Sequence, residues 1–169
     1  MDTFFEQILP VRKGAKDVLA VFGIWAAAFV VGYLAFYFLF SFLTMISLFI
    51  IVGAFYGAFK LSGNFNIEYE YIITNGTFDV DKIMAKSSRK RLATFELSTV
   101  SRLERYNPEI LKGNFSKKII ACNPDENSFI LVLPNGEGTG TCIVVAPNDR
   151  MKEAMVKFLP RHLADGAFK

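Results

Sequence analysis

Ionisable side chains are absent from a long stretch near the start of this 169-residue chain. Residues 18–59 form a run of 42 positions without a single Asp, Glu, Lys, Arg or His. A surface helix of a soluble protein is apolar on one face, whereas a helix made from this run is apolar on every face. The missing charge therefore indicates a membrane segment. It also removes the usual marker of an ion pathway or transporter site.

Residues that bind metals or carry out catalysis are also scarce. The chain has one histidine, His162, and two cysteines, Cys122 and Cys142, without C-x-x-C spacing. A structural zinc site needs about four nitrogen or sulfur ligands. We expect no metal, no cofactor and no catalytic residues, and hence no enzyme. Both thiols are expected to be reduced and largely buried.

The charge that is present is nearly balanced, with a net value of +3. Nucleic-acid binding needs a stronger and more clustered positive bias, so we expect no nucleic-acid partner. Two carboxylate pairs occur at strand spacing, Glu68 with Glu70 and Asp79 with Asp81. We expect these four side chains to face solvent.

The uncharged run is long enough to cross a membrane twice. At 1.5 Å per residue it would form a rod of about 63 Å, twice the roughly 30 Å of a hydrocarbon core. We predict spans at residues 18–39 and 42–59, with a turn at 40–44. A signal peptide is the alternative, but its apolar region covers only about 7–15 residues. The preceding residues 1–17 are expected to be a short amphipathic cytoplasmic segment, with an interfacial helix that ends before Pro10.

The basic residues around this run predict its orientation. Arg12, Lys13 and Lys16 precede the first span, and Lys60 follows the second. The positive-inside rule then predicts a multi-pass protein of the cell membrane with both termini in the cytoplasm. Small residues repeat along both spans and favour close helix packing, within one hairpin or between two copies. These are Gly23, Ala28, Gly32, Gly53 and Gly57.

From residue 64 the apolar pattern changes to a period of two, typical of strands. Asn75-Gly76 is a strong hairpin signal, because both residues tolerate positive φ. Asn148 is a favourable N-cap for a closing helix, and the glycine-rich residues 136–140 read as a hairpin tip. We therefore expect an α+β protein, with a transmembrane helical hairpin at 18–60 and an antiparallel β-sheet or barrel at 64–169. The strands of this sheet are expected at 67–73, 78–81, 91–97, 100–106, 115–122, 128–133 and 141–146.

Four stretches of the chain carry a resemblance to a known family. They are residues 1–7 (MDTFFEQ), 68–86 (EYEYIITNGTFDVDKIMAK), 89–92 (RKRL) and 159–163 (LPRHL). The chain resembles a family of small bacterial membrane proteins of unknown function. This resemblance implies two transmembrane helices followed by a bacterial pleckstrin-homology-like (PH-like) domain, and it brings no catalytic motif.

A run of basic residues is the strongest functional signal in the chain. It consists of Lys86, Arg89, Lys90 and Arg91. Such clusters near a bilayer attract anionic lipids, although a solvated loop is the alternative reading. We expect a non-enzymatic membrane-anchored binding or scaffolding protein. An accessory subunit of a larger membrane complex is the second hypothesis, with an unknown membrane protein or a second copy as partner.

Overall fold

The computed structural model describes residues 3–134 and 140–168, and these residues form two compact units. The described residues among 1–11, 68–83 and 89–169 form the first, here called the β unit. Residues 12–67 and 84–88 form the second, the hairpin unit. Of the glycine-rich segment predicted as a hairpin tip, only Gly140 lies within the described residues.

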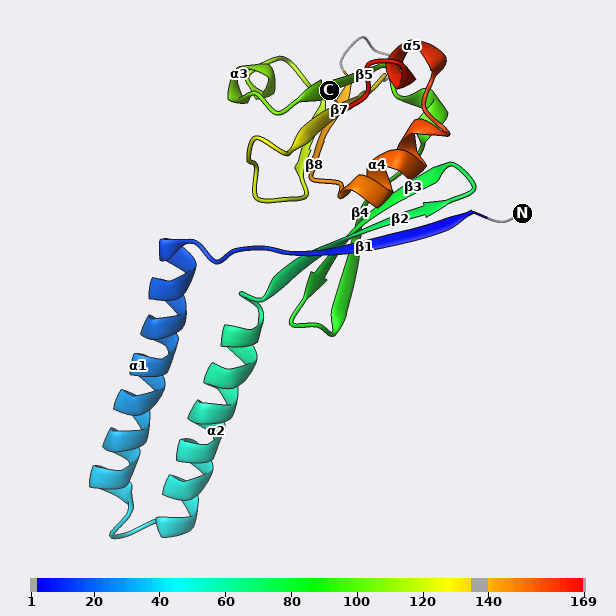
Figure 1. Cartoon of the computed structure of the whole chain (residues 1–169). Helices are drawn as coiled ribbons and strands as arrows, with labels where there is room; N and C mark the ends of the chain where they lie inside the picture. Colours follow the sequence, from blue (N-terminus) through cyan, green and yellow to red (C-terminus); the bar gives the residue numbers. More distant parts are fainter. Residues whose placement is uncertain (1–2, 135–139, 169) are drawn as a thin grey trace. The chain divides into compact units, whose positions relative to one another are not determined.

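The hairpin unit contains the two predicted long helices, α1 (Ala15–Leu39) and α2 (Thr44–Gly63), which run antiparallel in Figure 1. Both are long and apolar enough to cross a membrane. At 1.5 Å per residue they measure roughly 38 Å and 30 Å. The turn between them falls where it was predicted. There the Thr44 hydroxyl donates a hydrogen bond of 2.7 Å to the Phe40 carbonyl.

Small and aromatic side chains make the contact between α1 and α2. Ala28 and Ala58 are buried, and the Phe55 ring lies edge-on to the Phe29 ring at a centroid distance of 5.1 Å. A Cβ atom placed on Gly32 would lie 3.4 Å from the Phe55 ring. Gly32 therefore lets a bulky ring approach the backbone of the opposite helix.

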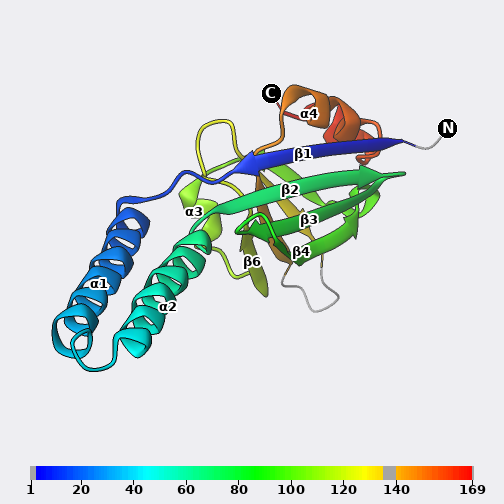
Figure 2. The same ribbon diagram turned by 90° about the horizontal axis from the view of Figure 1, so that it is seen from below.

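The β unit begins with a sheet in the order β1-β2-β3-β4 (Figure 2), formed by Phe4–Pro10, Ile67–Thr74, Thr77–Met84 and Ser88–Glu96. The predicted interfacial helix before Pro10 is wrong, because these residues form β1. It pairs antiparallel with β2, from Phe4 opposite Thr74 to Pro10 opposite Glu68. Backbone pairing with residues 58 to 70 positions away decides this conformation, and a local pattern cannot reveal it.

The helical hairpin is consequently an insertion between two neighbouring strands of one sheet. The chain leaves the sheet at Pro10, forms α1 and α2, and returns to it at Ile67. The next connection, between β2 and β3, is the predicted tight turn at Asn75-Gly76. These two residues have φ angles of 51° and 95°, as the Asn-Gly signal requires.

A second sheet has the order β5-β7-β8-β6, formed by Arg102–Arg105, Phe129–Leu133, Thr141–Val145 and Lys117–Ile120. The predicted α+β class and PH-like domain are confirmed. The sheet is not closed into a barrel, and β6 runs parallel to β8. Short helical segments complete the unit: η1 (Leu97–Thr99), α3 (Pro108–Leu111), α4 (Asp149–Val156) and α5 (Arg161–Ala164). As expected, Asn148 caps α4 by accepting a 2.8 Å hydrogen bond from the Met151 amide.

The two sheets and α4 share one core, which includes Tyr71, Phe78, Leu131, Ile143 and Met155. Polar side chains also link these layers. The hydroxyl of Tyr71 in β2 donates to the Ala121 carbonyl at 2.5 Å and accepts from the Ala146 amide at 3.2 Å. The side-chain amide of Gln7 in β1 donates to the backbone carbonyl of Ala146 at 3.0 Å and accepts from the backbone amide of Asn148 at 2.9 Å.

Candidate functional site

The four residues of the predicted basic run have different surroundings. Lys86 belongs to the hairpin unit, in a tight turn where its φ is 55°, whereas Arg89, Lys90 and Arg91 belong to β4 of the β unit. Successive side chains of a strand point to opposite faces of its sheet. The role of each residue therefore depends on which face it occupies and which groups it meets there.

Arg89 is engaged with a buried carboxylate. Its Nη1 atom lies 3.0 Å from Oε2 of Glu70, a side chain that is only 1% exposed. The approach is an ion pair rather than a hydrogen bond, since this oxygen has no hydrogen-bond partner among the described residues. Burial raises the pKa of Glu70, with Glu6 and Asp81 adding to the rise and Arg89 opposing it. The expected solvent exposure of Glu70 is wrong, because neighbouring strands cover it.

Arg91 is held by two carboxylates of β3. Its Nε atom donates to Asp81 Oδ1 at 2.9 Å, and its Nη1 atom lies 3.3 Å from Asp79 Oδ2. The hydrogen bond to Asp81 raises the pKa of Arg91. Asp81 is 6% exposed, so it too is not the solvent-facing group that the sequence indicated. These contacts give Arg91 a structural task, since each of its three guanidinium nitrogens already faces a carboxylate oxygen.

Lys90 contributes instead to a concave pocket of the β unit that we call the lysine pocket. Its volume is about 370 Å³, and it draws on strands β2, β3, β4 and β6. Of the described residues, no Asp or Glu is among those that line it. The lining residues are Tyr69, Lys82, Lys90, Arg91, Leu92, Lys117, Lys118, Ile119 and Ile120.

Some groups of the lysine pocket have weak partners. The Lys117 ammonium donates to the Leu92 carbonyl at 3.3 Å, and the Lys118 ammonium lies 6.0 Å from the centre of the Phe115 ring. Within the described part of the chain, Lys82 and Lys90 have no ion-pair partner. At the pocket wall, burial raises the pKa of Tyr69, with a smaller contribution from the charge of Cys122. The phenol therefore stays protonated and can donate a hydrogen bond.

The basic run predicted from the sequence includes Lys90 but not Lys82, Lys117 or Lys118. The pair Lys117-Lys118 does precede two isoleucines in a predicted strand, which is a sequence signal for a charged strand start. Strand β6 pairs with β8 in the second sheet, whereas β4 belongs to the first. No local sequence pattern indicates that β6 also lies near β4. The site becomes visible only when both sheets are in place.

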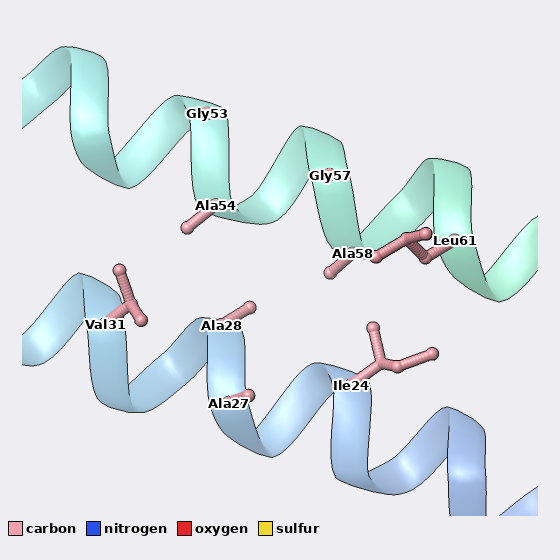
Figure 3. Close-up of a pocket in the computed structure, with 9 residues that line it drawn as sticks. All are labelled: Ile24, Ala27, Ala28, Val31, Gly53, Ala54, Gly57, Ala58 and Leu61. Atoms are coloured by element: carbon pink, nitrogen blue, oxygen red, sulfur yellow. The ribbon is translucent and has the colours of Figure 1, made fainter.

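The small residues predicted for helix packing divide into two groups. Ala28 is buried and Gly32 faces the Phe55 ring, whereas a Cβ atom on Gly23, Gly53 or Gly57 would meet nothing within 4 Å. Figure 3 shows the apolar groove of about 370 Å³ beside this seam, with Ala54 and Ala58 of α2 directed toward α1. Its lining residues are Ile24, Ala27, Ala28, Val31, Gly53, Ala54, Gly57, Ala58 and Leu61.

The two cysteines are free and buried, as predicted. Burial raises the pKa of both thiols, which keeps them protonated and poorly nucleophilic. Cys142 lies opposite Lys118 in the β6–β8 ladder. Cys122 comes four residues after Lys118, a distance of roughly 13 Å along an extended chain. Among the described residues no group of three His, Cys, Asp or Glu side chains could hold a metal ion.

These features define a PH-like α+β domain into which a pair of membrane-length helices is inserted. The chain matches the family described as bacterial PH-like domain (DUF6106) over residues 1–165, and it belongs to that family. The family resemblance found in the sequence is thereby confirmed. No curated protein and no solved structure matches the chain.

Proposed function

We propose that this protein is a non-enzymatic, membrane-anchored binding or scaffolding protein that presents its PH-like domain at the inner leaflet of the cell membrane. The observation that carries this proposal is the insertion of the helical hairpin between β1 and β2. These strands form one antiparallel ladder, so both ends of the hairpin must emerge on the side where the sheet forms. An even number of crossings satisfies this requirement.

The distribution of charge supports the cytoplasmic side. Arg12, Lys13 and Lys16 lie before or at the start of α1, and Lys60 lies in the last turn of α2. Lys86 joins Lys60 in lining a pocket at the end of α2. Since α1 and α2 are antiparallel, these five cations mark the same end of the hairpin, the end that the positive-inside rule assigns to the cytoplasm.

The chemistry of the buried groups supports binding rather than catalysis. Glu70 is paired with Arg89, and the two thiols have raised pKa values that leave them unreactive. Catalytic groups are usually tuned toward reactivity near neutral pH, with a base beside the nucleophile. The buried Glu70, Asp81 and Tyr71 instead contact groups of other segments and so join parts of the fold.

An accessory subunit of a larger membrane complex is the second candidate. The observation that favours it is the open space beside Gly53 and Gly57, which a helix of a partner or of a second copy could approach closely. In that case the helical hairpin would be an interaction surface as well as an anchor.

Cysteine labelling in intact cells tests the topology. Ser41→Cys, in the turn between the helices, should react with a membrane-impermeant maleimide added outside the cell. Arg161→Cys in α5 should react only after permeabilisation. The unmodified chain is a suitable control, because its own cysteines are buried. Labelling of Arg161→Cys in intact cells would refute the proposed orientation.

A further inference from the structure

We propose that the lysine pocket binds a phosphate monoester, carried either by a lipid headgroup or by a soluble metabolite. This inference rests on the proposed binding function and names the site and ligand chemistry for it. The pocket is the place in the β unit where cations gather on a concave surface. Arg89 does not line this pocket and forms an ion pair with Glu70 instead.

The charge balance of the lysine pocket favours a ligand with two negative charges. Five cationic side chains line it, and none of the described residues in its wall is acidic. Arg91 is paired with Asp79 and Asp81. The four lysines of the pocket have no carboxylate partner in the described part of the chain. A phosphate monoester carries about −1.5 to −2 at neutral pH, whereas a diester carries a single charge.

The donors of the pocket suit phosphate oxygens. Each lysine ammonium has three rotatable donors on a flexible stem, and the protonated Tyr69 hydroxyl adds one more. The stems arise from β3, β4 and β6, which are backbone-paired strands with a shared core beneath them. A volume of about 370 Å³ accommodates one headgroup rather than a long polyanion, which would need an extended basic track.

An exposed apolar side chain borders the same pocket. Ile120 lines it and is 45% exposed, while the adjacent Ile119 is buried in the core. A headgroup with attached acyl chains would meet both charge and apolar surface here. A soluble monoester would use the charge alone, so the two sources of the phosphate are experimentally separable.

The test uses the full-length chain in nanodiscs. In neutral phosphatidylcholine discs at low salt, glycerol 3-phosphate is titrated by calorimetry. In a second arm, native mass spectrometry counts retained lipid from discs that contain either phosphatidic acid, a monoester, or phosphatidylglycerol, a diester. We expect a monoester to bind in at least one arm, and binding should weaken as salt rises. Preference for phosphatidic acid identifies the lipid source, and binding of glycerol 3-phosphate identifies the soluble one.

The matched variants assign the binding to the pocket. Lys82→Ser/Lys90→Ser/Lys118→Ser should weaken it about 100-fold, since each lysine contributes roughly 1 kcal/mol. The Lys112→Ser/Lys157→Ser/Arg161→Ser variant loses equal charge outside the pocket and should bind within about twofold of the parent chain. The Lys82→Arg/Lys90→Arg/Lys118→Arg variant keeps the charge and should bind like the parent chain, which separates loss of charge from loss of the native fold.

Three results overturn the proposal: no binding to either monoester, retention of phosphatidylglycerol in the same non-zero amount as phosphatidic acid, or full binding by the serine variant with a native circular dichroism spectrum. None of these depends on which side of the membrane the β unit faces. The labelling of Arg161→Cys tests that separately, so failure of the ligand assignment and failure of the topology are distinguishable.

Discussion

The hairpin unit and the β unit satisfy their polar groups by different means. In α1 and α2 the backbone amides bond within their own helix, to carbonyls about one turn away, and no side chain between Val18 and Phe59 is charged. In the β unit, partners are remote in sequence. Gln7 bonds to Ala146 and Asn148, and Tyr71 bonds to Ala121 and Ala146.

This difference indicates which changes should destabilise each unit. A helix that bonds to itself tolerates the loss of its neighbours, especially in a membrane, where an unsatisfied backbone is costly. A sheet assembled from distant segments loses stability when any one of them is removed. We therefore expect changes that separate remote partners to have the largest effects.

The largest expected effect comes from removing β1. A fragment of residues 64–169, the domain boundary indicated by the sequence, lacks this strand and leaves an edge of β2 unpaired. We expect it to lose most of its free energy of unfolding, which is about 5–15 kcal/mol for a typical domain, and to aggregate. Residues 3–11 joined by a short glycine–serine linker to residues 64–169 should melt cooperatively. Equal melting temperatures of the fragment 64–169 and the linked chain, measured by circular dichroism, would contradict the assigned role of β1.

A smaller loss should follow from deleting one bridging hydroxyl. Tyr71→Phe leaves the buried Ala121 carbonyl and Ala146 amide without this partner, at a cost of about 1–3 kcal/mol. Chemical denaturation of the linked β unit measures this loss. The matched change in the hairpin unit, Tyr33→Phe, affects an exposed ring of α1 and should leave the thermal stability of the full-length chain unaltered. A neutral Tyr71→Phe variant would show that the bridge is dispensable.

The same contrast explains what the sequence could predict. The hairpin follows from a local property, the uncharged run, so its spans and turn were predicted to within a few residues. The Asn75-Gly76 turn and the capped helix at Asn148 also depend on local chemistry. The strand character of residues 4–10 depends on β2, and nothing within those residues distinguishes a paired strand from an amphipathic helix.

The lysine pocket was predictable only in part for the same reason. Lys86, Arg89, Lys90 and Arg91 lie within six residues of one another in the sequence. Strand alternation and carboxylate partners nevertheless give Arg89, Lys90 and Arg91 different surroundings. The lysines that accompany Lys90 come from two other strands. Which cations face a carboxylate is decided by tertiary structure.

The pH dependence of stability tests the protonation of Glu70, the buried partner of Arg89. Glu70 has a raised pKa, so the folded state binds its proton more tightly than the unfolded state. Its stabilising contribution is complete below the ordinary value of 4.5 and is lost as the pH rises through the folded pKa. Glu6, Asp81 and Arg89 also face this group.

Glu70→Gln should remove this dependence, and its stability relative to the parent chain should therefore improve as the pH rises from 4.5 toward neutrality. Denaturation of both proteins across that range provides the measurement. Glu109→Gln, at an exposed surface pair, serves as the control and should behave like the parent chain. A Glu70→Gln variant that loses stability relative to the parent with rising pH would contradict the direction assigned to Glu70.

The smallest effects should separate neighbouring cations of β4. Arg91→Ala deprives Asp79 and Asp81 of their partner and should lower the free energy of unfolding by more than Lys90→Ala does, although solvent around the half-exposed guanidinium keeps the loss small. Lys90→Ala removes an unpaired ammonium and should change stability by less than about 0.5 kcal/mol. Comparable losses for the two variants in urea denaturation would show that Lys90 has a structural role.

Because the helical hairpin interrupts the sheet, completion of the β unit would, under the proposed topology, also report on membrane insertion during synthesis. The β1 residues leave the ribosome first, but their partner strand follows only after both helices have been made. If a single helix crossed the bilayer, β1 and β2 would be stranded on opposite sides and could not pair. A chain inserted with the wrong number of crossings would therefore expose an unfolded domain to proteases. Protease resistance of the β unit in membranes should thus appear only after the second helix has inserted.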